Sequence, residues 1–298
     1  MFQNFSERKL FIAARHGFCN GVRRALETVE KVWQQYGSQR PVCVYHEIVH
    51  NNAVIADFKR RGVQFVDDLQ DVPDHAVLIW SAHGTAPGLK RLAAERHLQT
   101  VDAACPLVQK LHNLALERLA ANDLVIFIGH ANHPETRGVL GCGQIYCVGS
   151  SEDCAMLPDI ESNRQAAVLT QTTWCQEDID KILPILKERY ENLQLISNIC
   201  HATAERQQAV RELIKFHNIE MLLVIGSPSS SNSRRLCETA QKYNVSAVLI
   251  DDPQEIGTLT LPSACRMGIT AGASVPGYLF DKALDILQKQ FDFTVCEE

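Results

Sequence analysis

Three of the eleven cysteines stand at matched places along this 298-residue chain. Cys19, Cys105 and Cys200 are separated by 86 and 95 residues, and each precedes a segment whose apolar residues recur at helical spacing. The N–H groups and the dipole at the start of a helix stabilise a thiolate. Three such thiolates gathered at one centre would bind a soft metal ion or a metal cluster, so metal–thiolate chemistry is the first to consider.

The spacing favours an iron–sulfur cluster over a structural zinc ion. Structural zinc usually uses close C-x-x-C pairs, and no two of the cysteines form one; a zinc site with three cysteines and one histidine stays open as an alternative. A [4Fe–4S] cluster normally has four cysteine ligands, so three would leave one iron with an open position. Such an iron could bind a substrate oxygen while the cluster supplies electrons.

The remaining cysteines lack this symmetry. A chain of this length without an export signal is better explained by reduced thiols than by disulfides. We expect these residues to be small structural side chains, mostly buried: Cys43, Cys142, Cys147, Cys154, Cys175, Cys237, Cys265 and Cys296.

Each of the three matched cysteines opens a similar series of predicted elements. The first helices have start signals at Asn20–Gly21, at Pro106 and at Thr203. A short apolar strand then leads into a polar loop three times, as "VCVYHEIVHNN", "LVIFIGHANHPETRG" and "MLLVIGSPSSSNSRR". Further strands and helices follow each loop, and this alternation is typical of parallel α/β units.

The repeat predicts an α/β fold of three similar lobes, in a pseudo-threefold arrangement around a central iron–sulfur cluster. We treat the chain as one catalytic unit, and the strand within 1–19 as a candidate member of the third lobe. The approximate lobes are 20–104, 105–199 and 200–298.

Polar side chains collect in the loops that follow the predicted strands. Functional loops of open α/β sheets lie beyond the carboxyl ends of the strands, so these side chains should line the site. Imidazoles, hydroxyls, an amide and helix-start N–H groups together suit a phosphate or diphosphate. The candidates are His50, His83, His130, His133, Glu135, Thr172, Ser230, Ser231, Asn232 and Ser274. The other histidines are expected at the surface or behind the site: His16, His46, His75, His97, His112, His201 and His217.

Composition and missing motifs narrow the function further. The net charge is −6, which does not suggest a broad nucleic-acid or anionic-membrane surface. There is no G-x-x-x-x-G-K-[ST] loop and no G-x-G-x-x-G fingerprint, so neither a nucleoside triphosphatase nor an ordinary dinucleotide-dependent reductase is indicated. With no signal-peptide pattern and no apolar run of about 18 residues, we expect a soluble cytoplasmic protein.

Nine short motifs, in order from about residue 15 to 277, resemble those of one known family. They are "GFCNGV", "EIVHN", "SAHG", "DAACPLV", "GHANHPE", "TQTT", "NICHATAERQ", "GSPSSSNSRRL" and "TAGASVP". The series is similar to that of the LytB-type 4-hydroxy-3-methylbut-2-enyl diphosphate reductases of the non-mevalonate isoprenoid pathway. Any one motif is weak, whereas nine in order are specific.

The resemblance implies a role for each matched residue. Cys19, Cys105 and Cys200 would hold one [4Fe–4S] cluster per chain and leave one iron open. Glu135 would supply a proton, and Thr172 would help to orient the substrate hydroxyl. The residues implied for the diphosphate are His50, His83, Ser230, Asn232 and Ser274, with His133 and Ser231 close to it.

The same resemblance implies the reaction and its partners. The family reductively removes the hydroxyl of the allylic diphosphate and yields isopentenyl and dimethylallyl diphosphates, with electrons usually supplied by ferredoxin or flavodoxin. This sequence departs from the family pattern near the matched positions without removing a cluster ligand. The departures are Ala104, His201, Ala204 and Pro228.

Three other readings remain to be weighed. Quinolinate synthase and the diphthamide-forming proteins also combine three lobes with three cysteine ligands, but the H-P-E and S-S-S-N-S motifs here favour an allylic diphosphate. A non-catalytic cluster sensor would leave Glu135 and the phosphate loop unexplained. A zinc hydrolase is disfavoured because the sequence has no H-E-x-x-H pattern.

Overall fold

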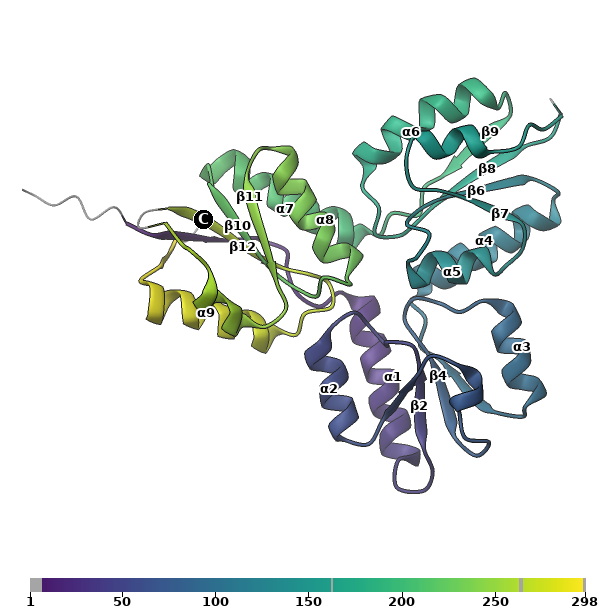
Figure 1. The fold of residues 1–298 in the computed structure, drawn as a ribbon, viewed down its shortest axis with the longest axis horizontal. Coiled ribbons are helices and arrows are strands. Elements are labelled where there is room, and N and C mark those ends of the chain that lie inside the picture. The colour runs from purple at the N-terminus through teal and green to yellow at the C-terminus, as the bar shows by residue number, and fades with distance from the viewer. Residues whose placement is uncertain (1–6, 162, 263–264, 297–298) are drawn as a thin grey trace, which may run out of the picture. The chain divides into compact units, whose positions relative to one another are not determined.

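The structure is a computed structural model that describes residues 7–161, 163–262 and 265–296. The described strands form three parallel sheets, each carrying helices (Figure 1). By their contacts the residues divide into two compact units. One holds the described parts of Met1–Cys19, His50–Val54 and His201–Glu298, and the other holds Asn20–Val49 and Ile55–Cys200.

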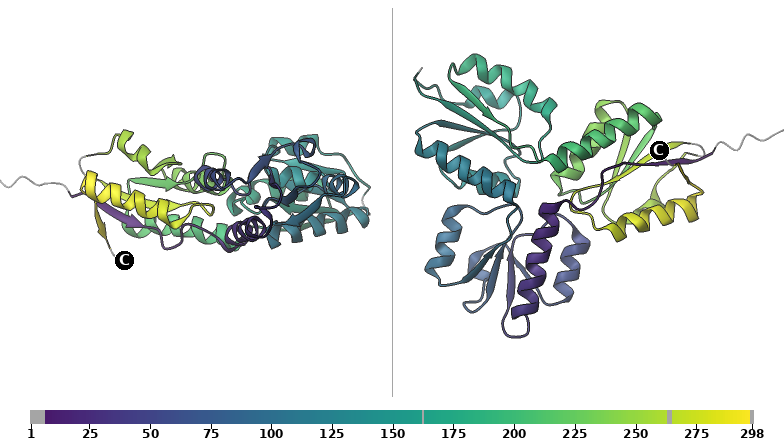
Figure 2. Two further views of the ribbon diagram at one scale, coloured as in Figure 1. Left: turned by 90° about the horizontal axis from the view of Figure 1, so that it is seen from below. Right: turned by 180° about the vertical axis from the view of Figure 1, so that it is seen from behind.

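The first sheet has the strand order β3-β2-β4-β5. Trp80 in β4 pairs with Asp102 in β5, so that the last strand ends just before the loop that leads to Cys105. The second panel of Figure 2 shows α1 running along this sheet. The elements are α1 (Asn20–Tyr36), β2 (Val42–Tyr45), α2 (Asn52–Arg60), β3 (Gln64–Val66), the 3₁₀ helix η1 (Leu69–Asp71), β4 (Val77–Trp80), α3 (Pro87–Glu95) and β5 (Gln99–Asp102).

The second sheet has the order β7-β6-β8-β9. Its strands alternate between two apolar clusters, because successive side chains of a strand point to opposite faces. In β6, Ile126 faces the cluster that includes residues of α6, and Phe127 faces the cluster that includes residues of α4. The elements are α4 (Pro106–Ala120), β6 (Leu124–Ile128), α5 (Pro134–Leu140), β7 (Ile145–Val148), η2 (Glu152–Met156), β8 (Ala166–Thr170), α6 (Gln176–Arg189) and β9 (Leu193–Ile196).

The third sheet has the order β11-β10-β12-β1-β13 and joins strands from both ends of the chain. Leu10 of β1 pairs with Met267 of β12 on one side and with Val295 of β13 on the other. Residues of α9 pack on one face of this sheet, and residues of α7 and α8 pack on the other (Figure 1). The elements are β1 (Lys9–Ile12), α7 (His201–His217), β10 (Met221–Ile225), α8 (Ser231–Lys242), β11 (Ser246–Ile250), η3 (Pro253–Thr258), β12 (Arg266–Ala271), α9 (Gly277–Phe291) and β13 (Thr294–Cys296).

The prediction of three similar α/β lobes with parallel sheets is confirmed. The strands of each sheet can be numbered 1 to 4 in the order in which the repeat predicts them, with β1 taken as strand 4 of the third sheet. All three sheets then have the spatial order 2-1-3-4. The third sheet then adds β13 at its edge. The strand that precedes each matched cysteine is the fourth of its sheet, and the helix that follows the cysteine begins the next repeat.

One helix start differs from the prediction. The structure begins α7 at His201, directly after Cys200, rather than at Thr203. Thr203 lies in the first turn, is buried, and its hydroxyl accepts a bond from the side-chain amide of Asn232. Thr203 therefore joins α7 to α8 through its side chain and does not act as an N-cap.

No helix in the described part of the chain is long and apolar enough to cross a membrane.

Candidate active site

The three matched cysteines share one backbone arrangement. Each follows the fourth strand of a sheet and donates its N–H to the carbonyl of a residue just beyond the third strand of the same sheet. This bond holds the chain as it turns from the strand into the next helix. The bonds are Cys19 to Ala273 (3.1 Å), Cys105 to Ala82 (3.0 Å) and Cys200 to Thr172 (2.8 Å).

The three matched cysteines also share their exposure and their place at a helix start. All three residues are partly exposed, and each lies directly before the first residue of α1, α4 or α7. The N–H groups of the first helical turn have no partner within the helix. The donor set therefore fits iron–sulfur ligation, in which thiolates bind iron.

Most of the other cysteines have the environment of structural residues. Burial raises the pKa of Cys43, Cys154 and Cys265, and so keeps these thiols protonated. The same effect raises the pKa of Cys142 and Cys147 to about 11, and that of Cys237 to about 12. A protonated thiol is a poor metal ligand, so these residues do not compete with the matched set.

Glu135 is a buried carboxyl held by one residue. It lies in the first turn of α5 and is 2% exposed. The backbone N–H of Thr172 donates to Oε1 at 2.7 Å, and the hydroxyl of Thr172 donates to Oε2 at 2.7 Å. The carbonyl of Thr172 accepts the N–H of Cys200, so a single residue joins the carboxyl to a cysteine.

The environment raises the pKa of Glu135 to about 7. Loss of hydration is the largest cause, because burial disfavours the carboxylate, and the two bonds from Thr172 act in the opposite direction. A carboxyl with this pKa is divided between its two protonation states near neutral pH. It can therefore give up a proton in one step and regain it in another.

Two histidines lie near the start of α5 in the second unit. His133 precedes α5, and its Nδ1 accepts the N–H of Glu135 at 3.2 Å, which caps the helix. The ring of His83 meets the ring of His133 edge to face, with centroids 5.8 Å apart. Because Nδ1 of His133 is an acceptor, the neutral ring carries its proton on Nε2. His130 is engaged elsewhere, since its ring packs against Trp174 at 4.6 Å between centroids.

The other unit gathers the residues expected to hold phosphate. Ser230 is the N-cap of α8 and accepts the N–H of Ser233 at 3.3 Å. The carbonyl oxygen of the Asn232 side chain accepts the N–H of Ala273 at 2.9 Å. The start of α8 is thereby fixed to the loop after β12.

Ser274 completes this group. Its hydroxyl donates to the carbonyl of His50 at 2.8 Å, so it fixes the segment that carries His50 to the same loop. Ser230, Ser231, Asn232 and Ser274 are all buried. Hydroxyls, an amide, an imidazole and the N–H groups at the start of a twelve-residue helix form a set that suits an anionic phosphate.

The predicted residues thus form two groups, one in each compact unit. The first group contains Cys19, His50, Ser230, Ser231, Asn232 and Ser274, and the second contains Cys105, His83, His133, Glu135, Thr172 and Cys200. Within residues 7–161, 163–262 and 265–296, no three His, Cys, Asp or Glu side chains are grouped to hold a single metal ion. A cluster shared by the three cysteines stays a prediction.

Two residues of this region were not identified from the sequence. Arg206 is buried in α7 and donates to the carbonyls of Gly17 and Ala202, each at 2.6 Å, so it holds the loop before Cys19. His112 was assigned to the surface or to a place behind the site, and it is buried in α4. No pattern in the sequence separates either residue from an ordinary polar residue of an amphipathic helix.

The sequence matches known proteins over nearly its whole length. A profile of the family described as "LytB protein" matches residues 10–288. The 4-hydroxy-3-methylbut-2-enyl diphosphate reductase of Nitrosomonas europaea is 38% identical over 288 residues, which covers 94% of this chain and 88% of that protein. The protein of Mycobacterium bovis named 4-hydroxy-3-methylbut-2-enyl diphosphate reductase 2 is 40% identical over 98% of this chain and 89% of its own length.

Solved structures agree with these matches. The structure of E-1-hydroxy-2-methyl-but-2-enyl-4-diphosphate reductase from Plasmodium falciparum has a TM-score of 0.91 and 33% identity, over 97% of this chain and 91% of that one. A second structure, of (E)-4-hydroxy-3-methyl-but-2-enyl diphosphate reductase, "the terminal enzyme of the non-mevalonate pathway", has a TM-score of 0.66 and 26% identity. It covers 95% of this chain and 99% of that one.

Proposed function

Because this chain belongs to the LytB protein family, we propose that it reduces (E)-4-hydroxy-3-methylbut-2-enyl diphosphate. Two electrons and two protons convert the substrate into water and either isopentenyl or dimethylallyl diphosphate. The observation that carries the proposal is the Glu135–Thr172 pair. Thr172 donates two hydrogen bonds to the buried carboxyl of Glu135, and its own carbonyl accepts the N–H of Cys200.

Cys19, Cys105 and Cys200 would hold a [4Fe–4S] cluster. The cluster would supply electrons one at a time and a Lewis-acidic iron with an open position. The chain's own part is to keep three thiolates at helix starts, each with its backbone N–H already bonded to a neighbouring loop.

The serine-rich start of α8 would bind the diphosphate. Ser230, Ser231 and Asn232 offer hydroxyl and amide donors there, with Ser274 and His50 held on the adjoining segments. Asn232 is positioned before substrate arrives, because its amide oxygen already accepts the N–H of Ala273, whereas Ser274 would exchange its bond to the carbonyl of His50 for one to the diphosphate. A fixed donor set loses little freedom on binding, which favours affinity. His83 would also bind the diphosphate, with His133 close to it.

Glu135 would provide a proton for the departing hydroxyl. Hydroxide is a poor leaving group, so transfer of a proton as the carbon–oxygen bond breaks allows oxygen to leave as water. Thr172 would hold the carboxyl in place, and its hydroxyl oxygen would help to orient the substrate hydroxyl by accepting a hydrogen bond from it. Burial of Glu135 supports this role, since it keeps part of the population protonated at neutral pH.

The electron donor in this proposal is a protein of the ferredoxin or flavodoxin type, because the cluster takes single electrons. The proposed location is the cytoplasm. We treat the whole chain as one catalytic unit, with lobes at about 20–104, 105–199 and 200–298.

The proposal is tested by anaerobic reconstitution with iron and sulfide, followed by product analysis with the hydroxylated diphosphate and a chemical reductant. We expect a brown protein with about four irons per chain that forms both products. Replacing any one of the three ligand cysteines with serine should abolish turnover. Cys296→Ser, at the partly exposed edge strand β13, is the matched control and should leave iron content and turnover unchanged.

The proposal would be contradicted by a colourless protein that binds one zinc per chain after reconstitution. It would also be contradicted by a brown protein that forms neither product.

A further inference from the structure

His112 lies in α4, two helical turns after Cys105, and its ring fills the space left by two glycines. A Cβ atom on Gly84 would lie 2.8 Å from Nε2 of the ring. A Cβ atom on Gly138 would lie 3.1 Å from both Nε2 and Cε1. Real Cβ atoms essentially never show the first distance, and the second is tighter than nine in ten of their contacts, so the imidazole packs directly against the two glycine backbones.

Each of the segments that meet at this ring carries a residue of the proposed site. Gly84 follows His83 directly, and Gly138 lies one turn after Glu135 in the same short helix, α5. The third segment is α4 itself, which begins directly after Cys105. A Cβ on Gly138 would also lie 3.3 Å from the carbonyl oxygen of Gly84, so the loop and the helix approach each other around the ring.

The surroundings indicate that the ring acts by its shape and not by charge. Burial is the main cause that lowers the pKa of His112 to about 4; the charge of Lys90 acts in the same direction, and that of Asp102 opposes it. The ring is therefore neutral at neutral pH. Nδ1 lies 3.8 Å from Sγ of Cys142, and Nε2 has no hydrogen-bond partner in the part of the chain that the structure describes.

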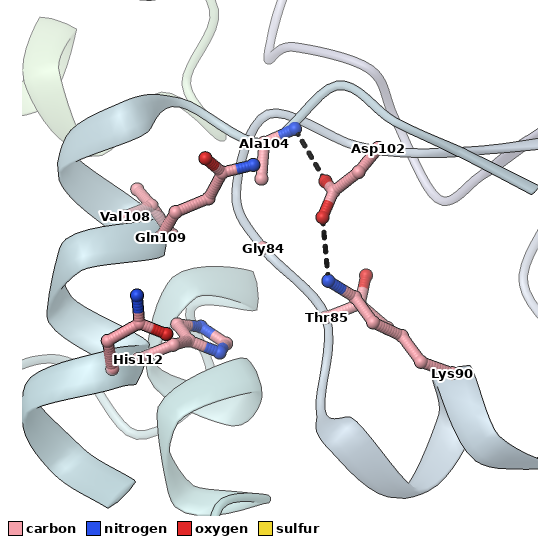
Figure 3. A pocket seen from close by; sticks show the side chains of 9 residues that line it. Gly84, Thr85, Lys90, Asp102, Ala104, Val108, Gln109 and His112 are labelled. Carbon is pink, nitrogen blue, oxygen red and sulfur yellow. Dashed lines mark hydrogen bonds and ion pairs between the residues drawn. The ribbon is translucent and has the colours of Figure 1, made fainter. Parts of the chain in front are cut away.

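A polar cavity of about 240 Å³ borders the ring, as Figure 3 shows. On its far side, Asp102 accepts the N–H of Ala104 at 2.9 Å and the ammonium group of Lys90 at 2.7 Å, which fixes the loop before Cys105. Glycine backbone therefore packs against the ring, and the cavity borders the part of the ring that the glycines leave uncovered. If the ring were removed, the cavity, which Gly84 already lines, would extend to Gly138 in α5.

We propose that His112 is a positioning residue for the reduction, whose ring sets the spacing between the loop of His83 and the helix of Glu135. The predicted effect of His112 on kcat rests on the proposed function. The packing that carries the inference is independent of the reaction.

The first test is His112→Ala in the reconstituted enzyme. With rates expressed per cluster, kcat should fall tenfold or more, because a small displacement of a proton donor has a large effect on rate. The pH at which kcat declines should also move, because the protonation of Glu135 depends on its burial and on Thr172. A loss of folded protein alone would change neither quantity. Asn113→Ala, an exposed position on the same cavity, is the control and should change kcat less than twofold.

The second test needs no activity. Amide hydrogen exchange of Thr172, whose N–H donates to Glu135, should be at least tenfold faster in His112→Ala than in the parent protein. Exchange of Val168 in the middle of β8 provides the reference for general destabilisation. Equal changes at the two amides would overturn the proposal. If the parent protein fails to reduce the diphosphate, this measurement still decides the role of His112.

The third test uses a compensating pair. Gly138→Ala brings a methyl group against the ring and should lower kcat by itself. In the double variant the methyl occupies part of the space that His112→Ala leaves, so its kcat should exceed that of the slower single variant at least threefold. If kcat of the double variant fell by the product of the factors measured for the two single variants, the proposal would be overturned.

Discussion

At the scale of single residues, the proposed chemistry depends on one carboxyl, that of Glu135, and on how its surroundings hold its proton. Glu135 has a raised pKa because it is buried, while Thr172 limits the increase through two hydrogen bonds. If Glu135 is the proton donor proposed above, its pKa should govern how both kcat and stability depend on pH.

Glu135→Gln should keep the cluster and substrate binding, while kcat falls by about 10²-fold or more, because the amide cannot give up a proton. In the parent enzyme, kcat should decline as pH rises through about 7, the pKa of this carboxyl, since the protonated form is lost. Steady-state rates per iron across pH 6–9 provide the measurement. Near-normal turnover in the variant would remove Glu135 from this role.

The free energy of unfolding should also depend on the protonation of Glu135. The folded pKa of about 7 lies above the ordinary value of 4.5, so the folded protein holds the proton more tightly. Stability from this group is fully present below pH 4.5 and is lost as pH rises to about 7, by up to about 3 kcal/mol. Urea unfolding of the apoprotein at pH 5 and pH 8 should show the loss, and Glu135→Gln should reduce it. An unchanged pH dependence in the variant would contradict the burial argument.

At the scale of elements, helix starts carry most of the predicted ligands. The three cysteines precede α1, α4 and α7, and the serine-rich loop begins α8. Their types and spacing could be recognised in the sequence because the same strand, loop and helix recur three times. The supporting contacts could not be recognised. Thr172 binds Glu135 through its backbone N–H as well as its side chain, and a backbone donor has no sequence signature.

Asn232→Ala should weaken binding of the diphosphate about tenfold, with a smaller effect on kcat. The variant loses one donor and also releases the N–H of Ala273, and a hydrogen bond to a charged group contributes about 1.5–3 kcal/mol. Calorimetric titration with substrate checks the affinity. Gln241→Ala, exposed near the end of the same helix, is the matched control and should bind normally. An unchanged affinity in Asn232→Ala would make the loop structural only.

At the scale of the whole molecule, the three sheets repeat one strand order, but the third is built from both ends of the chain. The repeat itself was predictable from strand and loop motifs. The burial of His112 was not, because the two glycines that make room for it lie in distant segments and nothing local marks them. Pairings and packing between remote residues are settled by tertiary structure, beyond the reach of local patterns.

Leu10→Ala tests the closure of the third sheet. Leu10 is fully buried in β1, among residues of β12 and α9, so the truncation should lower the free energy of unfolding by about 2–5 kcal/mol. Leu116→Ala, 41% exposed on α4, should change it by less than about 0.5 kcal/mol. Urea unfolding compares the two variants. Equal effects would mean that β1 adds little to the sheet.

The pairing of Leu10 with Met267 has a consequence during synthesis. A ribosome that adds about 5–20 residues per second makes the second of these residues roughly 10–50 s after the first. Through that interval Leu10 and Phe11, both buried in the finished protein, have no sheet to join. These two apolar side chains therefore stay exposed on the growing chain until β12 has been made.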